Sequence, residues 1–453
     1  GALLAVVAPR AGAALALWVG WANAALALAL FGSVGSETAL GGWAAPLGIA
    51  LRLDGLSWPF LALTAAVMAL TGSGAAARGF LAAPGAAALW LLLLGGMNAL
   101  FLSGDLFNLY VALEVVSLSA VALTALGGRG AAAPALRYLF VGLTGSLLYL
   151  AGVALVYRAT GALDLRLAAA AAGLDGVALA APLALATLGL LMKGGVAPFH
   201  FWLPPAHSAA NPAASAALSG VVVKAALYLL LRLWTGAPEG ALEAAEPLFR
   251  ALGLLALGVS ALGALRAERL KALIAYSTVG QVGYIVLALG FAAGAPLALK
   301  AAVAFAIAHG LAKAAVFAAA GAIRTANGHD RIDELTDPGP RYGPAKGAVA
   351  LGAMTLMGLP PSGGFLAKWT LAEAALGRGS WWMAPLLVGG AVLTSLKMVR
   401  LADGLIRTRA PAAAAPSAAA ARGWSALALA AAAVAMGFGG PALQALVLGG
   451  TAP

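Results

Sequence analysis

Long apolar runs, separated by short stretches rich in polar residues, glycine and proline, follow one another along almost the whole chain. A run of about 20 apolar residues is long enough to cross the hydrocarbon core of a membrane as an α-helix. The pattern predicts thirteen spans, at about 11–31, 57–76, 85–103, 106–126, 134–157, 177–197, 213–234, 248–265, 270–291, 298–322, 346–376, 382–402 and 424–449. Residues 1–7 read as the end of one more helix, so we expect an all-α polytopic membrane protein with about fourteen transmembrane helices.

Composition agrees with this pattern and narrows the chemistry. Hydrophobic residues make up 62% of the chain and charged residues only 9%, whereas about a quarter of a soluble domain is charged. The sequence has no cysteine, and its four histidines do not show the spacing of metal ligands. It also shows no phosphate-binding loop after a strand. We therefore expect no metal, no cofactor and no nucleotide-driven step in this chain.

The net charge of +11 is unevenly distributed between alternate loops. One side receives 15 basic residues, namely Arg10, Arg78, Arg129, Arg137, Arg266, Arg269, Lys271, Arg324, Arg331, Arg341, Lys346, Arg400, Arg407, Arg409 and Arg422. The other side receives 7, namely Arg52, Arg158, Arg166, Arg232, Arg250, Lys300 and Arg378. Because basic loops stay in the cytoplasm, the first side is predicted to be cytoplasmic and both termini to lie outside. The positive charge thus reflects topology and does not indicate nucleic acid, and the alanine- and proline-rich stretch 410–421 is predicted to be a flexible cytoplasmic linker.

Six ionisable residues fall inside the apolar runs, namely Glu114, Lys193, Lys224, Lys313, Lys368 and Lys397. A charge at the middle of a span costs about 2.5–3.5 kcal/mol on insertion scales, so such residues are expected to face one another or water and to carry function. A lysine near the end of a span can instead extend its amine to the lipid headgroups, and for Lys397 both interpretations stay open.

The spacing of four of these lysines repeats along the chain. Lys193 and Lys224 are 31 residues apart, Lys368 and Lys397 are 29 apart, and the two pairs are offset by 175 and 173 residues. In both halves the first lysine lies beside a cluster of glycine and proline. Paired, interrupted segments are typical of transport sites built from broken helices at the interface of two repeats.

Five helices in each repeat would invert the second repeat relative to the first. We predict N-terminal helices over 1–84, a first inverted repeat over 85–235, a second over 241–405, and the linker with the last helix over 406–453. The two repeats do not match fully, because the residue 174 positions after Glu114 is Ala288.

Four motifs stand in and beside these runs. They are GDLFNLYV at 104–111 ahead of Glu114, MKGGVAPFHFWLP at 192–204 followed by Ala206 and His207, YSTVGQVG at 276–283, and GLPPSGGF at 358–365. Together they resemble the antiporter-like subunits shared by Mrp-type cation/proton antiporters, membrane-bound hydrogenases and respiratory complex I, over roughly residues 50–400. The first motif is most similar to the D subunit of the Mrp antiporters and to its hydrogenase relatives.

This resemblance implies a proton relay inside one subunit of a bacterial or archaeal plasma-membrane complex. It implies that Glu114 is the essential carboxylate, that Lys193 is the lysine of the first broken helix, and that Lys224 is a bridging lysine. His309 and Lys368 are implied to continue the same line into the second half.

Electrostatics supports such roles independently of the resemblance. Desolvation lowers the pKa of a buried lysine, and a nearby carboxylate raises it again. At an assumed separation of about 7 Å and an effective dielectric constant of about 20, two unit charges interact by about 2 kcal/mol. Movement of Glu114 relative to Lys193 is therefore predicted to decide whether Lys193 holds its proton.

The histidines allow two interpretations each. His309 and Lys313 are four residues apart and so share one face of a helix, which predicts a link between the two halves; a histidine packed and hydrogen-bonded in the bundle is the alternative. His200 and His207 flank two prolines after the first break, where they either line the cytoplasmic mouth or belong to a packed loop.

Two functions follow from these observations. The favoured one is a proton-translocating subunit of a multisubunit antiporter that exchanges protons for a monovalent cation, most simply Na⁺. The alternative is a proton-pumping membrane-arm subunit of a redox-driven complex. A scaffold with a vestigial channel fits less well with the intact set of buried charges. The expected partners are other hydrophobic subunits, the lipid bilayer, protons and a monovalent cation.

The predicted orientation can be tested in the cysteine-free chain with Ser417→Cys. Because the uneven distribution of basic residues puts the linker in the cytoplasm, we expect an impermeant thiol reagent to label this cysteine in inside-out vesicles but not in intact cells. Labelling in intact cells would reverse the topology.

Overall fold

The computed structural model describes residues 8–172, 179–238, 240–337, 339–406 and 423–439, and these ranges are almost entirely helical. Eight helical segments in them are long and apolar enough to cross a membrane. The helices are α2 (Pro9–Ala29), α3 (Ser57–Ala77), α4 (Ala86–Leu102), α5 (Leu106–Ala125), α6 (Ala132–Thr160), α7 (Leu165–Ala172), α8 (Ala180–Lys193), α9 (Leu203–Ala209), α10 (Pro212–Ala217), α11 (Val223–Thr235), α12 (Ala241–Leu265), α13 (Leu270–Leu289), α14 (Pro296–Asn327), α15 (Gly343–Met357), α16 (Gly363–Gly377), α17 (Met383–Ile406) and α18 (Trp424–Ala435). The predicted all-α polytopic fold is confirmed.

Each predicted span coincides with a helix or with an interrupted pair of helices. The span predicted at 346–376 is the pair α15 and α16, and the one at 213–234 is α10 and α11 joined by a π-helical turn, Leu218–Val222. The helix end expected at 1–7, the linker at 410–421 and the last part, 440–449, of the final predicted span lie outside the described residues.

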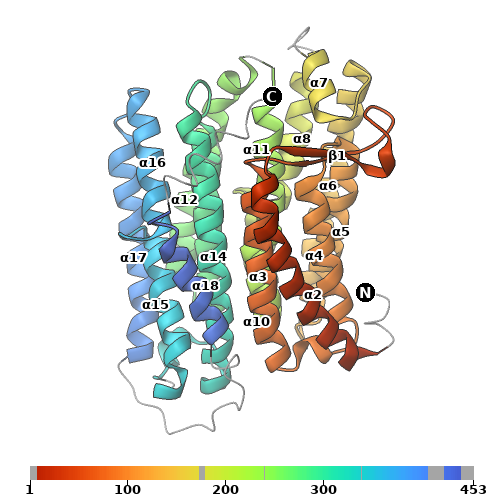
Figure 1. Ribbon diagram of the computed structural model, residues 1–453. Helices are drawn as coiled ribbons and strands as arrows, with labels where there is room; N and C mark the ends of the chain where they lie inside the picture. The colour runs from red at the N-terminus through yellow and green to blue at the C-terminus, as the bar shows by residue number, and fades with distance from the viewer. Residues whose placement is uncertain (1–7, 173–178, 239, 338, 407–422, 440–453) are drawn as a thin grey trace.

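An element that the hydropathy pattern does not predict is a two-stranded antiparallel sheet after α2. Strand β1 (Ser36–Ala39) pairs with β2 (Ala50–Leu53), and Ser36 lies opposite Leu53. Figure 1 shows this hairpin and α7 at the same end of the helix bundle. We call this end the hairpin side. We call the opposite end the basic side, because the loops there hold the larger group of arginines and lysines.

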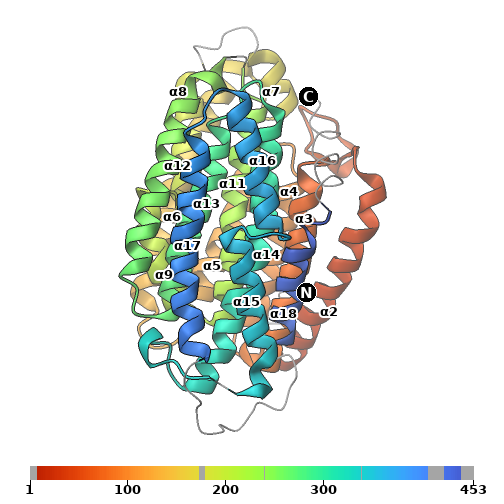
Figure 2. The same cartoon turned by 90° about the vertical axis from the view of Figure 1, so that its left-hand side faces the viewer.

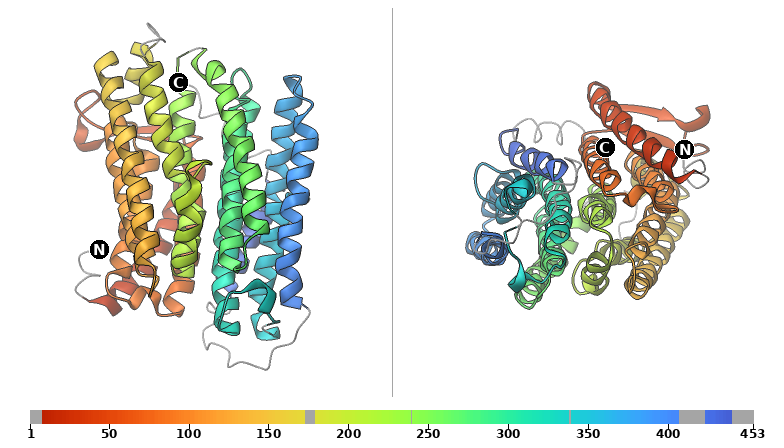
Figure 3. Two further views of the ribbon diagram at one scale, coloured as in Figure 1. Left: turned by 180° about the vertical axis from the view of Figure 1, so that it is seen from behind. Right: turned by 90° about the horizontal axis from the view of Figure 1, so that it is seen from below.

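The helices form two groups that lie side by side, as the end-on view shows (Figure 3, right). Helices α4 to α11 make up the first group and α12 to α17 the second, while α14 contacts α3 and α10 as well as its own neighbours. Alanine is the commonest residue of α14, with 14 of its 32 positions, and every residue from Ala301 to Ile323 is buried. Small side chains let neighbouring helices approach closely, so α14 can occupy the middle of the bundle.

The first predicted helix break lies directly after Lys193. Helix α8 ends at this residue, Gly195 has a φ of 63°, and the peptide bond between Ala197 and Pro198 is cis. Glycine adopts this left-handed conformation without the steric cost that a side chain adds, and proline lacks the amide that would continue the helix. The indole nitrogen of Trp202 donates to the Met192 carbonyl at 3.0 Å, which satisfies one of the oxygens at the broken end.

The second break separates α15 from α16, and Figure 2 shows the two halves one above the other. Gly358 has a φ of 78°, and the bond between Pro360 and Pro361 is cis. Ser362 then caps α16, because its hydroxyl accepts a hydrogen bond from the Phe365 amide at 3.3 Å. Both predicted interruptions are therefore present, and the division into two inverted repeats stays a prediction.

Helices α6 and α8 touch through their backbones, and this contact positions Lys193. A Cβ atom added at Gly189 would lie 2.2 Å from the Gly145 carbonyl oxygen and 2.8 Å from the Tyr149 amide nitrogen. No other residue type fits at Gly189 unless the two helices separate.

Gly189→Ala is therefore expected to destabilise the protein by about 1–3 kcal/mol, the usual cost of overpacking. The measurement is the thermal midpoint of the purified complex in detergent. Gly95→Ala in α4 is the matched control, because a Cβ atom there meets nothing within 4 Å. Equal midpoints for the two variants would contradict the packing role of Gly189.

Candidate functional site

The first predicted centre is a direct ion pair between α5 and α8. The ammonium nitrogen of Lys193 lies 2.9 Å from a carboxylate oxygen of Glu114, and it also donates to the Ser117 hydroxyl at 2.7 Å. The Ser146 hydroxyl from α6 donates to the same carboxylate oxygen. The separation of about 7 Å assumed for the energy estimate is therefore wrong for this state, in which the pair is closed.

Burial makes this pair sensitive to its surroundings. Only 4% of the Lys193 side chain and 18% of the Glu114 side chain are exposed. Lys193 is the last residue of α8, where the negative end of the helix dipole adds to the attraction for a cation. A buried charge that loses its partner is strongly destabilised, so opening the pair favours loss of the lysine proton.

The second centre is Lys224, which is completely buried at the start of α11. In a regular α-helix the Val223 amide would donate to the Ser219 carbonyl. In the π-helical turn before Lys224 it donates to the Leu218 carbonyl instead. The Ser219 carbonyl can then accept a hydrogen bond from the Lys224 ammonium group. Single π-helical turns are common at functional positions, and here the turn provides the partner of the lysine.

The third centre lies on α14 and is joined to the second by hydroxyl groups. The Ser219 and Thr278 hydroxyls are 3.0 Å apart, and Thr278 donates to the Ile274 carbonyl at 3.2 Å. The Lys313 ammonium group donates to the same Ile274 carbonyl at 2.7 Å. Lys224 and Lys313 are therefore connected through side chains and carbonyls of α10–α11 and α13.

His309 lies one helical turn before Lys313, as the sequence predicts, and only 2% of the residue is exposed. It interacts electrostatically with both Lys224 and Lys313. Neither of its ring nitrogens has a hydrogen-bond partner among the described residues. His309 is therefore packed in the bundle without a hydrogen bond to a described residue, and its part in a proton relay stays a prediction.

The fourth centre is Lys368 on α16, beside the second break. Its ammonium group donates to the Met357 carbonyl at 2.7 Å and lies 5.1 Å from the centre of the Tyr284 ring. The Gln281 amide donates to the neighbouring Leu356 carbonyl at 3.0 Å. The broken end of α15 thus supplies oxygens to side chains of α13 and α16.

One face of α13 connects the third and fourth centres. Ser277 accepts a hydrogen bond from Lys313, while Tyr284 lies beneath Lys368, and Gln281 stands between them at helical spacing. A cavity of about 300 Å³ between α12, α13 and α17 is lined by all three of these side chains. The sequence signal for this face is the helical spacing of Ser277, Gln281 and Tyr284.

Lys193 and Lys224 are less closely linked than the later centres. Among the described residues they share no hydrogen-bond partner, although α8 and α11 pack against each other. The residue expected to match Glu114 in the second half, Ala288, is buried, and Lys368 has a carbonyl as partner in place of a carboxylate.

Three further expectations need correction or remain open. The sequence predicts Lys271 in a cytoplasmic loop, but only 1% of it is exposed, and its ammonium group donates to the carbonyls of Ser208 and Ala210. His207 is fully buried against the Phe317 ring and cannot line a mouth, whereas His200 is half-buried. The side chain of Lys397 lies outside the described residues.

Comparisons with known proteins agree with the fold. The family model described as "NADH:quinone oxidoreductase/Mrp antiporter, TM" matches residues 103–394. The N subunit of the NADH-quinone oxidoreductase of Desulforudis audaxviator is 33% identical over 83% of this chain and 76% of the relative. The D subunit of the Na(+)/H(+) antiporter of Alkalihalophilus pseudofirmus is 29% identical over 80% and 74%, respectively. A chain of the Mrp complex from Dietzia sp. superimposes with a TM-score of 0.90 at 27% identity, covering 98% of this chain and 93% of that one.

Glu114→Ala is expected to lower proton flux at least tenfold in vesicles that contain the assembled complex. The substitution removes the only carboxylate that contacts Lys193 in the described residues, so the lysine is left as a neutral amine that cannot take part in exchange. Glu373→Ala is the control, because this carboxylate is exposed on α16 and contacts only Trp369 there. Wild-type flux in Glu114→Ala vesicles would exclude the ion pair from the mechanism.

Proposed function

We propose that this chain, which belongs to the NADH:quinone oxidoreductase/Mrp antiporter family, is the proton-translocating subunit of a multisubunit Na⁺/H⁺ antiporter. The observation that carries the proposal is the file of buried ionisable groups from one half of the chain to the other. In order, the file consists of Glu114, Lys193, Lys224, His309, Lys313 and Lys368. Other hydrophobic subunits are its partners, as in the multisubunit complex whose chain it resembles.

The Glu114–Lys193 pair acts as the switch at one end of this file. At an effective dielectric constant of about 20, opening the pair from 2.9 Å to about 7 Å costs about 3 kcal/mol, or a factor of roughly 150–300 in the proton affinity of the lysine. The open state releases the proton toward Lys224, and the closed state reloads Lys193. A movement of a few ångströms is therefore sufficient to control transfer.

The later centres pass the proton along the plane of the membrane. Lys224 donates to the Ser219 carbonyl and Lys313 to the Ile274 carbonyl, and the Ser219 and Thr278 hydroxyls lie between these two partners. His309 interacts electrostatically with both lysines. Because each charge changes the proton affinity of its neighbour, the sites titrate as one coupled set.

Three observations support cation/proton exchange over other uses of such a file. The GDLFNLYV motif ahead of Glu114 is most similar to the D subunit of Mrp antiporters, and the Mrp complex provides a chain that superimposes with a TM-score of 0.90. A relative named as the D subunit of a Na(+)/H(+) antiporter matches 80% of the chain.

The uneven distribution of basic residues supports an orientation with both termini outside.

A second function is favoured by a different observation. The relative named as the N subunit of an NADH-quinone oxidoreductase is 33% identical to this chain, more than the 29% of the antiporter relative. In a redox-driven complex the same residues would pump protons, with electron transfer in other chains as the source of energy. Identification of the chains that purify with this one separates the two functions, because iron–sulfur subunits occur only in the second.

A relay along the membrane plane predicts non-additive loss of transport. Lys224→Ala and Lys368→Ala should each abolish coupled proton flux, and the double variant should be no worse than either single one, since residues of one path act as a unit. Lys224→Arg should also fail, because a guanidinium group does not release its proton. The measurement is proton flux driven by an imposed sodium gradient in vesicles containing the assembled complex.

Lys300→Ala is the matched control, because this lysine lies on α14 with Lys313 but in the first turn, away from the file. Independent, multiplicative losses for Lys224→Ala and Lys368→Ala would mean that the two halves are separate channels. Normal transport by Lys224→Arg would remove Lys224 from the path.

A further inference from the structure

A column of polar side chains leads from Lys224 to the hairpin side, and the relay along the membrane plane does not use it. Lys224, Tyr228 and Arg232 are spaced by four residues on α11, so they lie on one face of this helix. The first two are completely buried, while 19% of the Arg232 side chain is exposed. With a rise of 1.5 Å per residue, the column is about 12 Å long.

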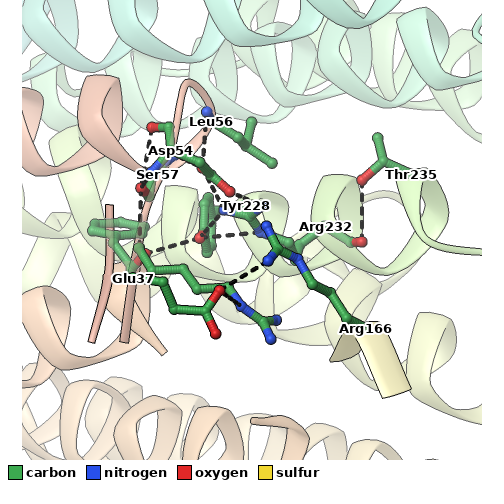
Figure 4. Close-up of polar contacts among 10 residues, drawn as sticks. Glu37, Asp54, Leu56, Ser57, Arg166, Tyr228, Arg232 and Thr235 are labelled. Carbon is green, nitrogen blue, oxygen red and sulfur yellow. Dashed lines mark hydrogen bonds and ion pairs between the residues drawn. The ribbon is translucent and has the colours of Figure 1, made fainter. Parts of the chain in front are cut away.

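The upper half of the column is a network of hydrogen bonds (Figure 4). The Arg232 guanidinium donates to the Tyr228 hydroxyl at 2.7 and 3.2 Å and forms a bidentate pair with Asp54 at 2.5 and 2.8 Å. The Tyr228 hydroxyl in turn donates to the Phe101 carbonyl at 2.9 Å. A single arginine thus fixes both the hydroxyl below it and the carboxylate above it.

Asp54 is held in its charged form at the top of α3. Burial raises the pKa of its carboxyl, but the hydrogen bonds from Arg232 and from the Leu56 and Ser57 amides outweigh this, so the pKa lies below its ordinary value. Only 15% of the Asp54 side chain is exposed, which keeps the pair with Arg232 partly desolvated and strong.

The lower half of the column is sealed by aromatic rings. The Tyr228 ring lies 4.8 Å from the Phe101 ring and 5.2 Å from the Phe60 ring, measured between centroids, and all three residues are at most 1% exposed. These rings come from α3, α4 and α11 and fill the helical turn between Lys224 and Arg232. The positive guanidinium beyond them is a further barrier to protons and cations.

We propose that this column is a closed proton outlet from Lys224 to the hairpin side, and that Tyr228 is its gate. The proposal rests on the proposed function, because it assigns Lys224 a second exit from the same relay. When the gate opens, the Lys224 ammonium group gives a proton to the Tyr228 hydroxyl oxygen and becomes a neutral amine, and the O–H proton of Tyr228 passes to a water molecule that enters from the hairpin side. No other bond is formed or broken, and rotation of the hydroxyl restores the starting state.

The gate has a clear mechanical connection to the surface. Asp54 follows β2, whose Arg52 binds Asp164 at 2.8 Å, and Glu37 of β1 pairs with Arg166 at 2.8 Å. Movement of the hairpin would therefore pull on Asp54, and through Arg232 on the Tyr228 hydroxyl. This gives the two short strands a role beyond covering the ends of the helices.

The test uses passive proton conductance of vesicles that contain the assembled complex, under a potassium diffusion potential and without a sodium gradient. Tyr228→Ala removes the ring and is expected to raise the proton leak at least tenfold. Adding Lys224→Ala to this variant should return the leak to within twofold of wild type, because the leak passes through Lys224. A leak that persists without Lys224 would overturn the proposal.

Two milder variants keep the test decisive if Tyr228→Ala does not assemble. Tyr228→Phe keeps the seal and removes the hydroxyl, so it should not leak. Asp54→Asn loosens Arg232 and should raise the leak several-fold, whereas Glu246→Gln weakens the pair with Arg250 on α12, away from the column, and should not. Equal leaks for Asp54→Asn and Glu246→Gln would overturn the gate. Failure of the relay itself would appear differently, as normal sodium-driven flux in the Lys224→Ala variant.

Discussion

The hydrocarbon core of a membrane offers no water to a lysine ammonium group, so each buried lysine of this chain needs a fixed oxygen beside it. The chain provides several of these oxygens where its helices depart from regular geometry. The end of α15 presents the Met357 carbonyl to Lys368, and the π-helical turn before α11 presents the Ser219 carbonyl to Lys224. Irregular backbone, which would weaken an isolated helix, here determines where positive charge can be placed.

The kind of partner distinguishes Lys193 from the other three lysines of the proposed relay. Lys193 has a carboxylate, whose attraction changes strongly with distance, while Lys224, Lys313 and Lys368 are bound by carbonyls that carry no net charge. An ion pair can be opened by a small movement, whereas a carbonyl keeps its dipole in place. In the proposed mechanism the switch therefore lies in the first half, and the remaining centres respond to it through their mutual electrostatic interaction.

Close helix packing makes this coupling possible and also isolates it. The backbones of α6 and α8 touch at Gly145 and Gly189, and a Cβ atom added at Gly310 of α14 would lie 2.7 Å from the Gly220 carbonyl oxygen. Small residues thus bring the polar groups of different helices together in the centre. Toward the hairpin side, aromatic residues fill the space around Tyr228, so the same interior is closed to protons in that direction.

Properties that depend on neighbours along the chain could be predicted from the sequence alone. The spans follow from the length of the apolar runs, and both breaks follow from glycine and proline, which act on the backbone within a few residues. The sequence also singles out Glu114 and Lys193, because a charge within an apolar run is costly wherever the run packs. Their contact at 2.9 Å could not be predicted, since it depends on how α5 and α8 are rotated about their axes.

Tertiary structure alone decided which polar groups meet. Ser277 and Tyr284 are ordinary residues in a helix until α14 and α16 place Lys313 and Lys368 against them. Lys271 has the sequence position of a loop lysine, yet carbonyls at the C-terminal end of α9 bind its ammonium group in the interior. The physical reason is the same in each case. Hydropathy and helix breaking are local properties, whereas a hydrogen bond between two helices forms only when both have packed with the matching rotation and position along their axes.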